Sequence, residues 1–590
     1  MSCRFYSLKL HPNYNLKGKR SLLETVFAIL TLGGSILAKQ HWEVGNWTHS
    51  FKHKAIALLE AIPLIGGIIA LLERLCIHFL QKETSQDEIL KAYFLYMKKS
   101  PDRMLISAKE VKQKLSVKCS LIDHFSFPLP VYTVFFYPKH IDKQRIVHAL
   151  ERTLEDFPLF AGRLKKTDGH LYIDCNNQGI EITTLYSEAR LADFLSQFPK
   201  LSATAFVNEI DPHAALKNAL PLFSIKLSYF SEGLAIGYSW HHSVGDMSTF
   251  MQFLSAVSAA AKGEKIPTPL VLRDREKDLY RNDLKGWEFG KEAPQNFCSE
   301  QATIAQRQGA SENENCEAKP TQTKTDSSIY FGIRSIHTET EHSPSADLKV
   351  LNFGDIFQLA KQQTFPPELV YLYFSNEELD TMRTAFSNEA AQKLTRNDAL
   401  CGHLLEAVAA CREDDSDTQC ASIAINARKK LKLDPNTPGN ILGMATIQLP
   451  KNSSSTLFAK TIHQNVSNYS LDFAVTEKFV QEQGGMEKIK WIIPIQFLPK
   501  YRNLIFTTWA NSGVYSIDFG VVPPDLFLPV GQVPLPWAAR IVEGFQNQGR
   551  LVALTLPSKV AQRITQPERL QNIHRYRSQT QQDPIWEWVK

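Results

Sequence analysis

The chain has 590 residues, of which 43% are hydrophobic and 22% charged, and its formal net charge is +5. This apolar content excludes a disordered or collagen-like protein, and so small a positive excess over this length argues against a nucleic-acid partner. Nine cysteines are scattered without a Cys-x-x-Cys pair, so a reducing compartment is expected and neither a disulfide framework nor a zinc site is.

The first ninety residues contain two apolar segments. Thr25–Ala38 carries no charge, and Ala55–Leu72 carries only Glu60. A helix that spans a membrane needs about 20 apolar residues, so both segments are short or marginal. They fit a tight membrane hairpin, two interfacial helices or the buried helices of a small domain. We favour membrane contact through residues 25–72, with the basic residues around them on one side of the membrane.

A mixed α/β pattern follows. Apolar residues alternate over Leu222–Phe230 and again from Leu234 to Trp240, with a Ser-Glu-Gly turn between them, which predicts a β-hairpin. The period then becomes helical, and Gly263 is placed to end this helix.

A second α/β stretch starts near Glu368. It contains an alternating strand at Leu369–Tyr373, a helix at Leu394–Cys411 and a strand at Ala421–Ala427. Between the two stretches, Cys298–Ser328 has no aromatic residue and is rich in polar side chains, which predicts a disordered insertion or a long crossover loop.

The segment Trp240–Asp246 places His242 four residues before Asp246, in the loop that follows a predicted strand. An imidazole titrates near neutral pH and can take a proton from a hydroxyl or an amine, so His242 is a candidate general base. Gly245 allows a backbone or a substrate to approach closely. Taken alone, the pattern also fits a hydrogen-bonded structural histidine, which is the more frequent case. His241 and His242 point in different directions and no acidic cluster accompanies them, so no metal is expected.

Several segments together resemble the BAHD acyltransferases of the coenzyme-A-dependent acyltransferase superfamily, and they occur in the family's order from about Lys109 to Ile564. The matches are Leu121–His124 for the early "DH" strand, Asp156–Leu164 for "YPLAGRL", His242–Asp246 for "HxxxD", Thr395–Leu400 for "STNDAL", Ile425–Arg428 with Gly439–Asn440 for "VNxR" and "GN", and Thr508–Trp509 with Asp518–Gly520 for "SW" and "DFGWG". Two positions depart from the family. Val521 and Val522 replace the Trp and Gly of "DFGWG", and Met247 replaces a Gly that follows the motif acid, which narrows the expected acceptor pocket.

The resemblance implies an α/β fold of two similar α+β domains like chloramphenicol acetyltransferase, with mixed sheets, in addition to the N-terminal helical apolar segment. The expected units are residues 1–90 as the membrane-associating segment, 100–263 as the N-terminal acyltransferase domain, 264–365 as a crossover with the insertion, 366–564 as the C-terminal domain and 565–590 as a polar tail.

By the same resemblance, His242 deprotonates an alcohol or amine acceptor, which attacks an acyl-coenzyme A thioester directly. Thr508, Trp509 and Gly245 are the expected oxyanion or channel residues. The expected structural supports of the site are Asp246, Arg428 and Asp518, with Asp246 paired to Arg428.

The protein is expected to bind no cofactor and to use acyl-coenzyme A as co-substrate with a small-molecule acceptor. It is expected to be a monomer that binds no nucleic acid. It is expected to be membrane-associated with its catalytic domains in the cytosol, where coenzyme A thioesters are found, or alternatively to be cytoplasmic. Two other functions stay open: a condensation-type transfer from a carrier-protein thioester, and a catalytically silent binding module tethered at a membrane.

Overall fold

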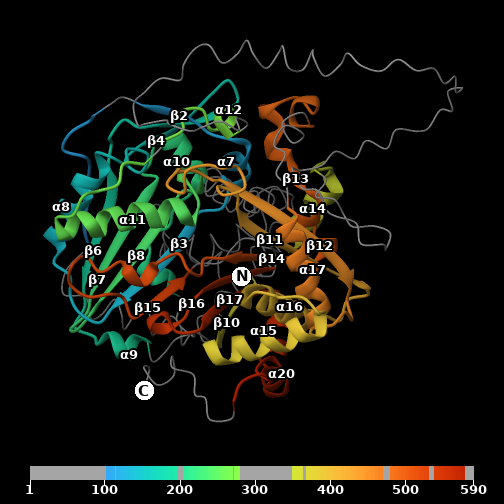
Figure 1. The fold of residues 1–590 in the computed structure, drawn as a ribbon. Coiled ribbons are helices and arrows are strands. Elements are labelled where there is room, and N and C mark those ends of the chain that lie inside the picture. Colours follow the sequence, from blue (N-terminus) through green and yellow to red (C-terminus); the bar gives the residue numbers. More distant parts are fainter. Residues whose placement is uncertain are drawn as a thin grey trace, which may run out of the picture.

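The computed structural model describes residues 101–112, 115–195, 203–269, 271–279, 348–362, 367–469, 479–530 and 537–578. The predictions for residues 1–90, for membrane contact through 25–72 and for the insertion at 298–328 lie outside these ranges. Within them, no helix has both the length and the apolar character needed to cross a membrane. The described residues form two α/β halves that lie side by side (Figure 1).

The first half is built on a six-stranded sheet with the order β1-β6-β7-β8-β3-β15. Only the β6–β7 pair of this sheet is parallel, so the sheet is mixed. Its strands are β1 (Asp102–Ile106), β3 (Val131–Tyr137), β6 (Ile180–Tyr186), β7 (Phe223–Tyr229), β8 (Leu234–Trp240) and β15 (Leu526–Pro529). The predicted hairpin is confirmed as β7 and β8, and all residues of β8 are buried.

Two helices cover one face of this sheet, α8 (Lys143–Leu154) and α11 (Met247–Lys262) (Figure 1). Helix α11 is the predicted helix after the His242 loop. Its first turn is capped by the Asp246 carboxylate, which accepts from the Thr249 N–H. It ends at Gly263 in the left-handed conformation that glycine adopts without strain. The change from strand to helix therefore leaves a short, fixed loop that carries His242.

The second half repeats this plan with the strand order β10-β17-β16-β14-β11-β12. The β11–β14 and β14–β16 pairs are parallel, and the others are antiparallel. The strands are β10 (Glu368–Phe374), β11 (Thr418–Asn426), β12 (Leu442–Pro450), β14 (Leu504–Thr508), β16 (Ala538–Glu543) and β17 (Arg550–Leu556), and the covering helices are α15 (Asn376–Ala390), α16 (Arg396–Ala410) and α17 (Ser455–Ser467). The predicted strands near 369 and 421 and the predicted helix near 394 are confirmed as β10, β11 and α16.

One strand crosses between the halves. Strand β15 follows β14 in the chain, yet it pairs with β3 at the edge of the first sheet. The preceding segment also packs on the first half, where Ser258 of α11 donates to the Asp518 carboxylate at 3.1 Å and Arg145 donates to the Phe519 carbonyl at 2.9 Å. The residues that resemble the "DFG" motif therefore fasten the second half of the chain to the first.

The expectation that Leu121–His124 forms a strand is wrong, because these residues begin helix α7 (Leu121–Ser126). The Ser120 hydroxyl accepts from the Asp123 N–H, and the Asp123 carboxylate accepts from the Ser120 N–H at 2.7 Å. This capping box satisfies two backbone donors of the first turn at once and favours a helix.

The remaining described elements lie around the two large sheets. They include a three-stranded sheet of β2 (Ser116–Lys118), β5 (His170–Asp174) and β4 (Arg163–Thr167) and a two-stranded sheet of β9 (Leu348–Val350) and β13 (Ile492–Pro494). They also include the helices α9 (Leu191–Leu195), α10 (Pro212–Asn218), α12 (Arg275–Leu279), α14 (Phe353–Gln362), α19 (Ser558–Ile564) and α20 (Pro567–Ile573). Helix α20 lies in the range that the sequence assigned to a polar tail. It is followed by Arg577, whose guanidinium pairs with the buried Glu378 of α15 at 3.1 Å.

Candidate active site

A cavity of about 770 Å³ lies between the halves and is lined by residues of both. The first half contributes His242 and one side of α11, including Met247 and Met251. The second half contributes Thr508 and Trp509 at the end of β14, together with other residues of its sheet. A concave site of this size between two domains is typical of a small-molecule pocket. The three residues that the sequence predicted for the site, His242, Thr508 and Trp509, thus line the same cavity.

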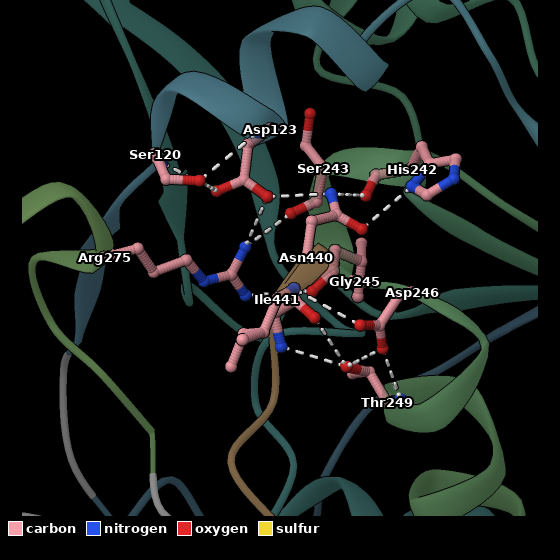
Figure 2. A network of polar contacts seen from close by, with 12 residues as sticks. Ser120, Asp123, His242, Ser243, Gly245, Asp246, Thr249, Arg275, Asn440 and Ile441 are labelled. Atoms are coloured by element: carbon pink, nitrogen blue, oxygen red, sulfur yellow. Dashed lines mark hydrogen bonds and ion pairs between the residues drawn. The ribbon is translucent and has the colours of Figure 1, made fainter. Parts of the chain in front are cut away.

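His242 begins a single 3-10 turn (His242–Val244) directly after β8, and its ring is held from one side by Asn440 (Figure 2). The His242 Nδ1 lies 2.9 Å from the Asn440 Oδ1. The Asn440 amide nitrogen donates to the His242 carbonyl at 2.6 Å and to the Asp123 carboxylate at 2.8 Å. Because both of these partners can only accept, the amide oxygen must face the imidazole, and Nδ1 carries the ring proton. The lone pair of the ring therefore lies on Nε2.

The protonation of His242 is set by its surroundings. Burial lowers the pKa of its imidazole below the usual value of 6.5, and the hydrogen bonds to the ring together with the nearby Asp246 and Asp123 carboxylates only partly oppose this shift. The ring is neutral at pH 7 as a result. A neutral imidazole with a fixed tautomer is prepared to accept a proton at Nε2.

Behind Asn440 lies a buried ion pair, also drawn in Figure 2, between Asp123 of α7 and Arg275 of α12. The Arg275 guanidinium donates to the Asp123 carboxylate at 3.2 Å and to the carbonyls of Ser243 and Val244 at 2.7 and 2.9 Å. Arg275 thus ties the His242 turn to the acceptor that orients Asn440. Sequence reasoning missed this chain of contacts, although Asp123 and Asn440 both lie in motif segments.

Asp246 is held by a second ion pair on the other side of the loop. Two nitrogens of Arg428 donate to its two carboxylate oxygens at 2.8 and 3.0 Å, and both side chains are almost fully buried. The carboxylate also accepts from the backbone N–H groups of Thr249 and Ile441, toward which it points in Figure 2. The hydrogen bonds of this carboxylate therefore join the His242 loop to helix α11 and to the second half of the chain.

Gly245 fits tightly against the first turn of α11. A Cβ atom at this position would lie 2.6 Å from the Thr249 side chain, and the Gly245 carbonyl accepts from the buried Trp240 indole at 3.0 Å. The described residues that line the cavity do not include Gly245. The glycine makes room for the first turn of α11.

The other candidate residues occupy different surroundings. The Thr508 hydroxyl donates to the Asn397 side chain at 2.8 Å at the start of α16, and Trp509 borders the cavity beside Phe527. Asp518 lies at the far end of α11, 3.7 Å from the Lys262 ammonium, and is not among the lining residues. His241 is buried against the edge of Phe127, and burial lowers its pKa to about 3. Among the described residues, no cluster of three or more His, Cys, Asp and Glu side chains could hold a metal ion.

The two α/β halves thus enclose a cavity that is bordered by a neutral histidine held in one orientation. The model of the Transferase family matches residues 98–560, so the chain belongs to this family, that of the BAHD acyltransferases.

Known relatives agree with this membership. Rosmarinate synthase from Plectranthus scutellarioides is 29% identical over 142 residues, which are 24% of this chain and 33% of the relative, so the match spans about a third of that enzyme. Akuammiline synthase 2 from Alstonia scholaris is 22% identical over 433 residues, 68% of this chain and 79% of the relative.

A solved structure shows the same fold. TRI101 from F. graminearum, in complex with coenzyme A and deoxynivalenol, matches 77% of this chain and 98% of its own with a TM-score of 0.55 and 14% identity. The mixed α/β fold predicted from the motifs is thereby confirmed.

Proposed function

We propose that this protein transfers an acyl group from an acyl-coenzyme A to a hydroxyl or amine of a small molecule, with His242 as general base. Membership of the acyltransferase family supports the reaction class, and the coenzyme A in the TRI101 complex supports the donor. The observation that carries the proposal is the fixed tautomer of His242, whose Nδ1 faces Asn440 while the residue borders the cavity.

In this reaction the acceptor loses its proton to Nε2 of His242 while its oxygen or nitrogen attacks the thioester carbonyl. The tetrahedral intermediate then collapses, the C–S bond breaks, and the coenzyme A sulfur takes the proton back from the imidazolium. No acyl-enzyme is formed, and the histidine ends neutral as it began. The Asn440 amide oxygen accepts the hydrogen bond from Nδ1–H throughout and stabilises the charged ring.

The negative charge on the tetrahedral oxygen needs donors that are already in place. We assign this role to the segment Thr508–Trp509. An indole N–H can only donate, so Trp509 is the stronger candidate. The Thr508 hydroxyl is bonded to Asn397 and would have to turn away from this partner to donate. Gly245, which packs on Thr249, belongs with Asp246, Arg428 and Asp518 as a support of the loop and of the contact between the halves.

Free thiol release from a panel of acyl-coenzyme A donors, with pooled alcohols and amines, tests the proposal. Replacement of His242 by Ala is expected to lower the rate by about 10²- to 10⁴-fold, because the attack loses its base. In the same assay Trp509→Phe keeps the ring but lacks the N–H donor, and about a 10²-fold loss is expected. The proposal fails if the folded wild-type chain releases no thiol, or if His242→Ala releases it at the same rate.

A further inference from the structure

The second half of the chain places a buried amide in the wall of the cavity. Gln496 lies in a 3-10 turn (Ile495–Phe497) between β13 and β14, and it is one of the residues that line the cavity, together with its neighbours Pro494 and Phe497. Pro494 and Pro499 flank the turn, and the restricted φ of proline holds the backbone on both sides of Gln496.

This side chain has no hydrogen-bond partner in the protein. Gln496 is only 1% exposed, yet neither its Oε1 nor its Nε2 is bonded. Among the described residues it is the one side chain in which two buried polar atoms lack a partner. Buried polar groups are nearly always hydrogen-bonded, because the loss of water is otherwise uncompensated. The amide therefore points to a partner that comes from outside the chain.

A second buried glutamine shows the contrast. Gln419 is also buried, but its Oε1 accepts from Arg412 and its Nε2 donates to the carbonyls of Cys420 and Arg502. The chain thus satisfies a buried glutamine fully where the side chain serves the fold. At Gln496 it leaves an acceptor and a donor side by side on one planar group.

We infer that Gln496 is a specificity-determining residue that binds an amide group of a substrate, with its Oε1 accepting an N–H and its Nε2 donating to a C=O. The inference rests on the proposed function, because it takes the cavity as the substrate site. A primary carboxamide or a lactam makes both bonds at once. The amide belongs either to the acceptor, where it makes both bonds, or to the pantetheine arm of coenzyme A, whose secondary trans amides make one of the two.

Binding of matched probes to the full chain, measured by calorimetry, tests the inference without turnover. The probes are 4-(hydroxymethyl)benzamide, the apolar 4-ethylbenzyl alcohol, 4-(hydroxymethyl)benzoate and pantetheine. We expect the benzamide or pantetheine to bind the wild type about 10- to 100-fold more tightly than the apolar alcohol, since a buried amide left unpaired is costly. Gln496→Leu should abolish this preference. Loss of the benzamide preference identifies the acceptor as the source, and loss of pantetheine affinity identifies the donor.

Thermal unfolding separates recognition from a structural role. Gln496→Leu removes two unpaired polar atoms and is expected to raise Tm, whereas the control Gln419→Leu breaks bonds within the protein and is expected to lower it. The inference is overturned if Gln496→Leu keeps the wild-type preference or lowers Tm, or if no amide probe is preferred. It is also overturned if the benzoate binds as tightly as the benzamide, since the buried Arg540, which also lines the cavity, would then be the recognising group. A preserved preference without thiol release would contradict the proposed reaction alone.

Discussion

The amides of Asn440 and Gln496 are equally buried, each 1% exposed, and differ completely in their partners. Asn440 uses its oxygen and both of its amide hydrogens on His242 and Asp123. Gln496 uses neither its oxygen nor its nitrogen. Burial alone therefore does not tell what a polar group is for. An amide whose hydrogen bonds are all made within the protein fixes a neighbouring side chain, whereas the unpaired amide of Gln496 keeps a donor and an acceptor for the substrate amide that we infer.

The largest effect is expected at the Asp246–Arg428 ion pair, which supports the loop that carries His242. Arg428→Met leaves a buried carboxylate without its cation, and the free energy of unfolding is expected to fall by about 3–5 kcal/mol. Denaturant unfolding of the full chain measures this loss. The control is Arg190→Met at the exposed Arg190–Glu232 pair, for which less than about 1 kcal/mol is expected. Equal losses of unfolding free energy in the two variants would show that the buried pair contributes no more to stability than the exposed one.

The orientation of the base can be removed at Asn440. Asn440→Ala is expected to lower kcat by about 10- to 100-fold with little change in KM, because the imidazole is no longer held. Burial lowers the pKa of His242 below its ordinary value, and the neutral base is lost as pH falls through this lowered pKa. The acid limb of the wild-type pH–rate profile, where activity falls, should therefore lie below the ordinary pKa of a histidine. The bond from Asn440 raises this pKa, so its loss should move the acid limb to still lower pH.

A control separates this effect from general destabilisation. Asn503 is another buried amide, bonded to Ser422 within the second sheet. Asn503→Ala is expected to lower Tm and to leave the acid limb in place. If the acid limb of Asn440→Ala also stayed in place, Asn440 would have no role in setting the state of the base.

The smallest effect on activity is expected from removal of the N-terminal residues. Both cavity walls lie within residues 98–560, which the family model matches. A chain that begins at Leu90 should keep its kcat/KM and lose its sedimentation with phosphatidylcholine–phosphatidylserine vesicles, because residues 25–72 carry the apolar segments. Continued sedimentation of the shortened chain would contradict membrane contact through these residues.

The sequence predicted what depends on local order. Alternation gave the hairpin before His242, and the helical period gave α11 with its glycine end. The helix at Leu121 was also readable, because Ser120 and Asp123 have the spacing of a capping box, but the motif resemblance favoured a strand.

Contacts between distant residues could not be predicted in this way. Asp123 and Asn440 are 317 positions apart, and nothing in the pattern around either one shows that they meet. The position of Arg428 was available only through the family resemblance. The missing partners of Gln496 are a property of the folded cavity, since a glutamine in a sequence gives no sign of what will surround it.

The crossing strand β15 has a consequence for how the protein is made. A ribosome adds roughly 5–20 residues per second, so Asn440, 198 positions after His242, emerges on the order of 10 to 40 s later. Strand β3 lacks its edge partner for longer still, until Leu526–Pro529 is made. Its open edge can meanwhile pair with other nascent chains. A chain that stops between the halves has both an unfinished sheet and an unoriented histidine, so a prematurely terminated product is at once prone to aggregate and unable to react.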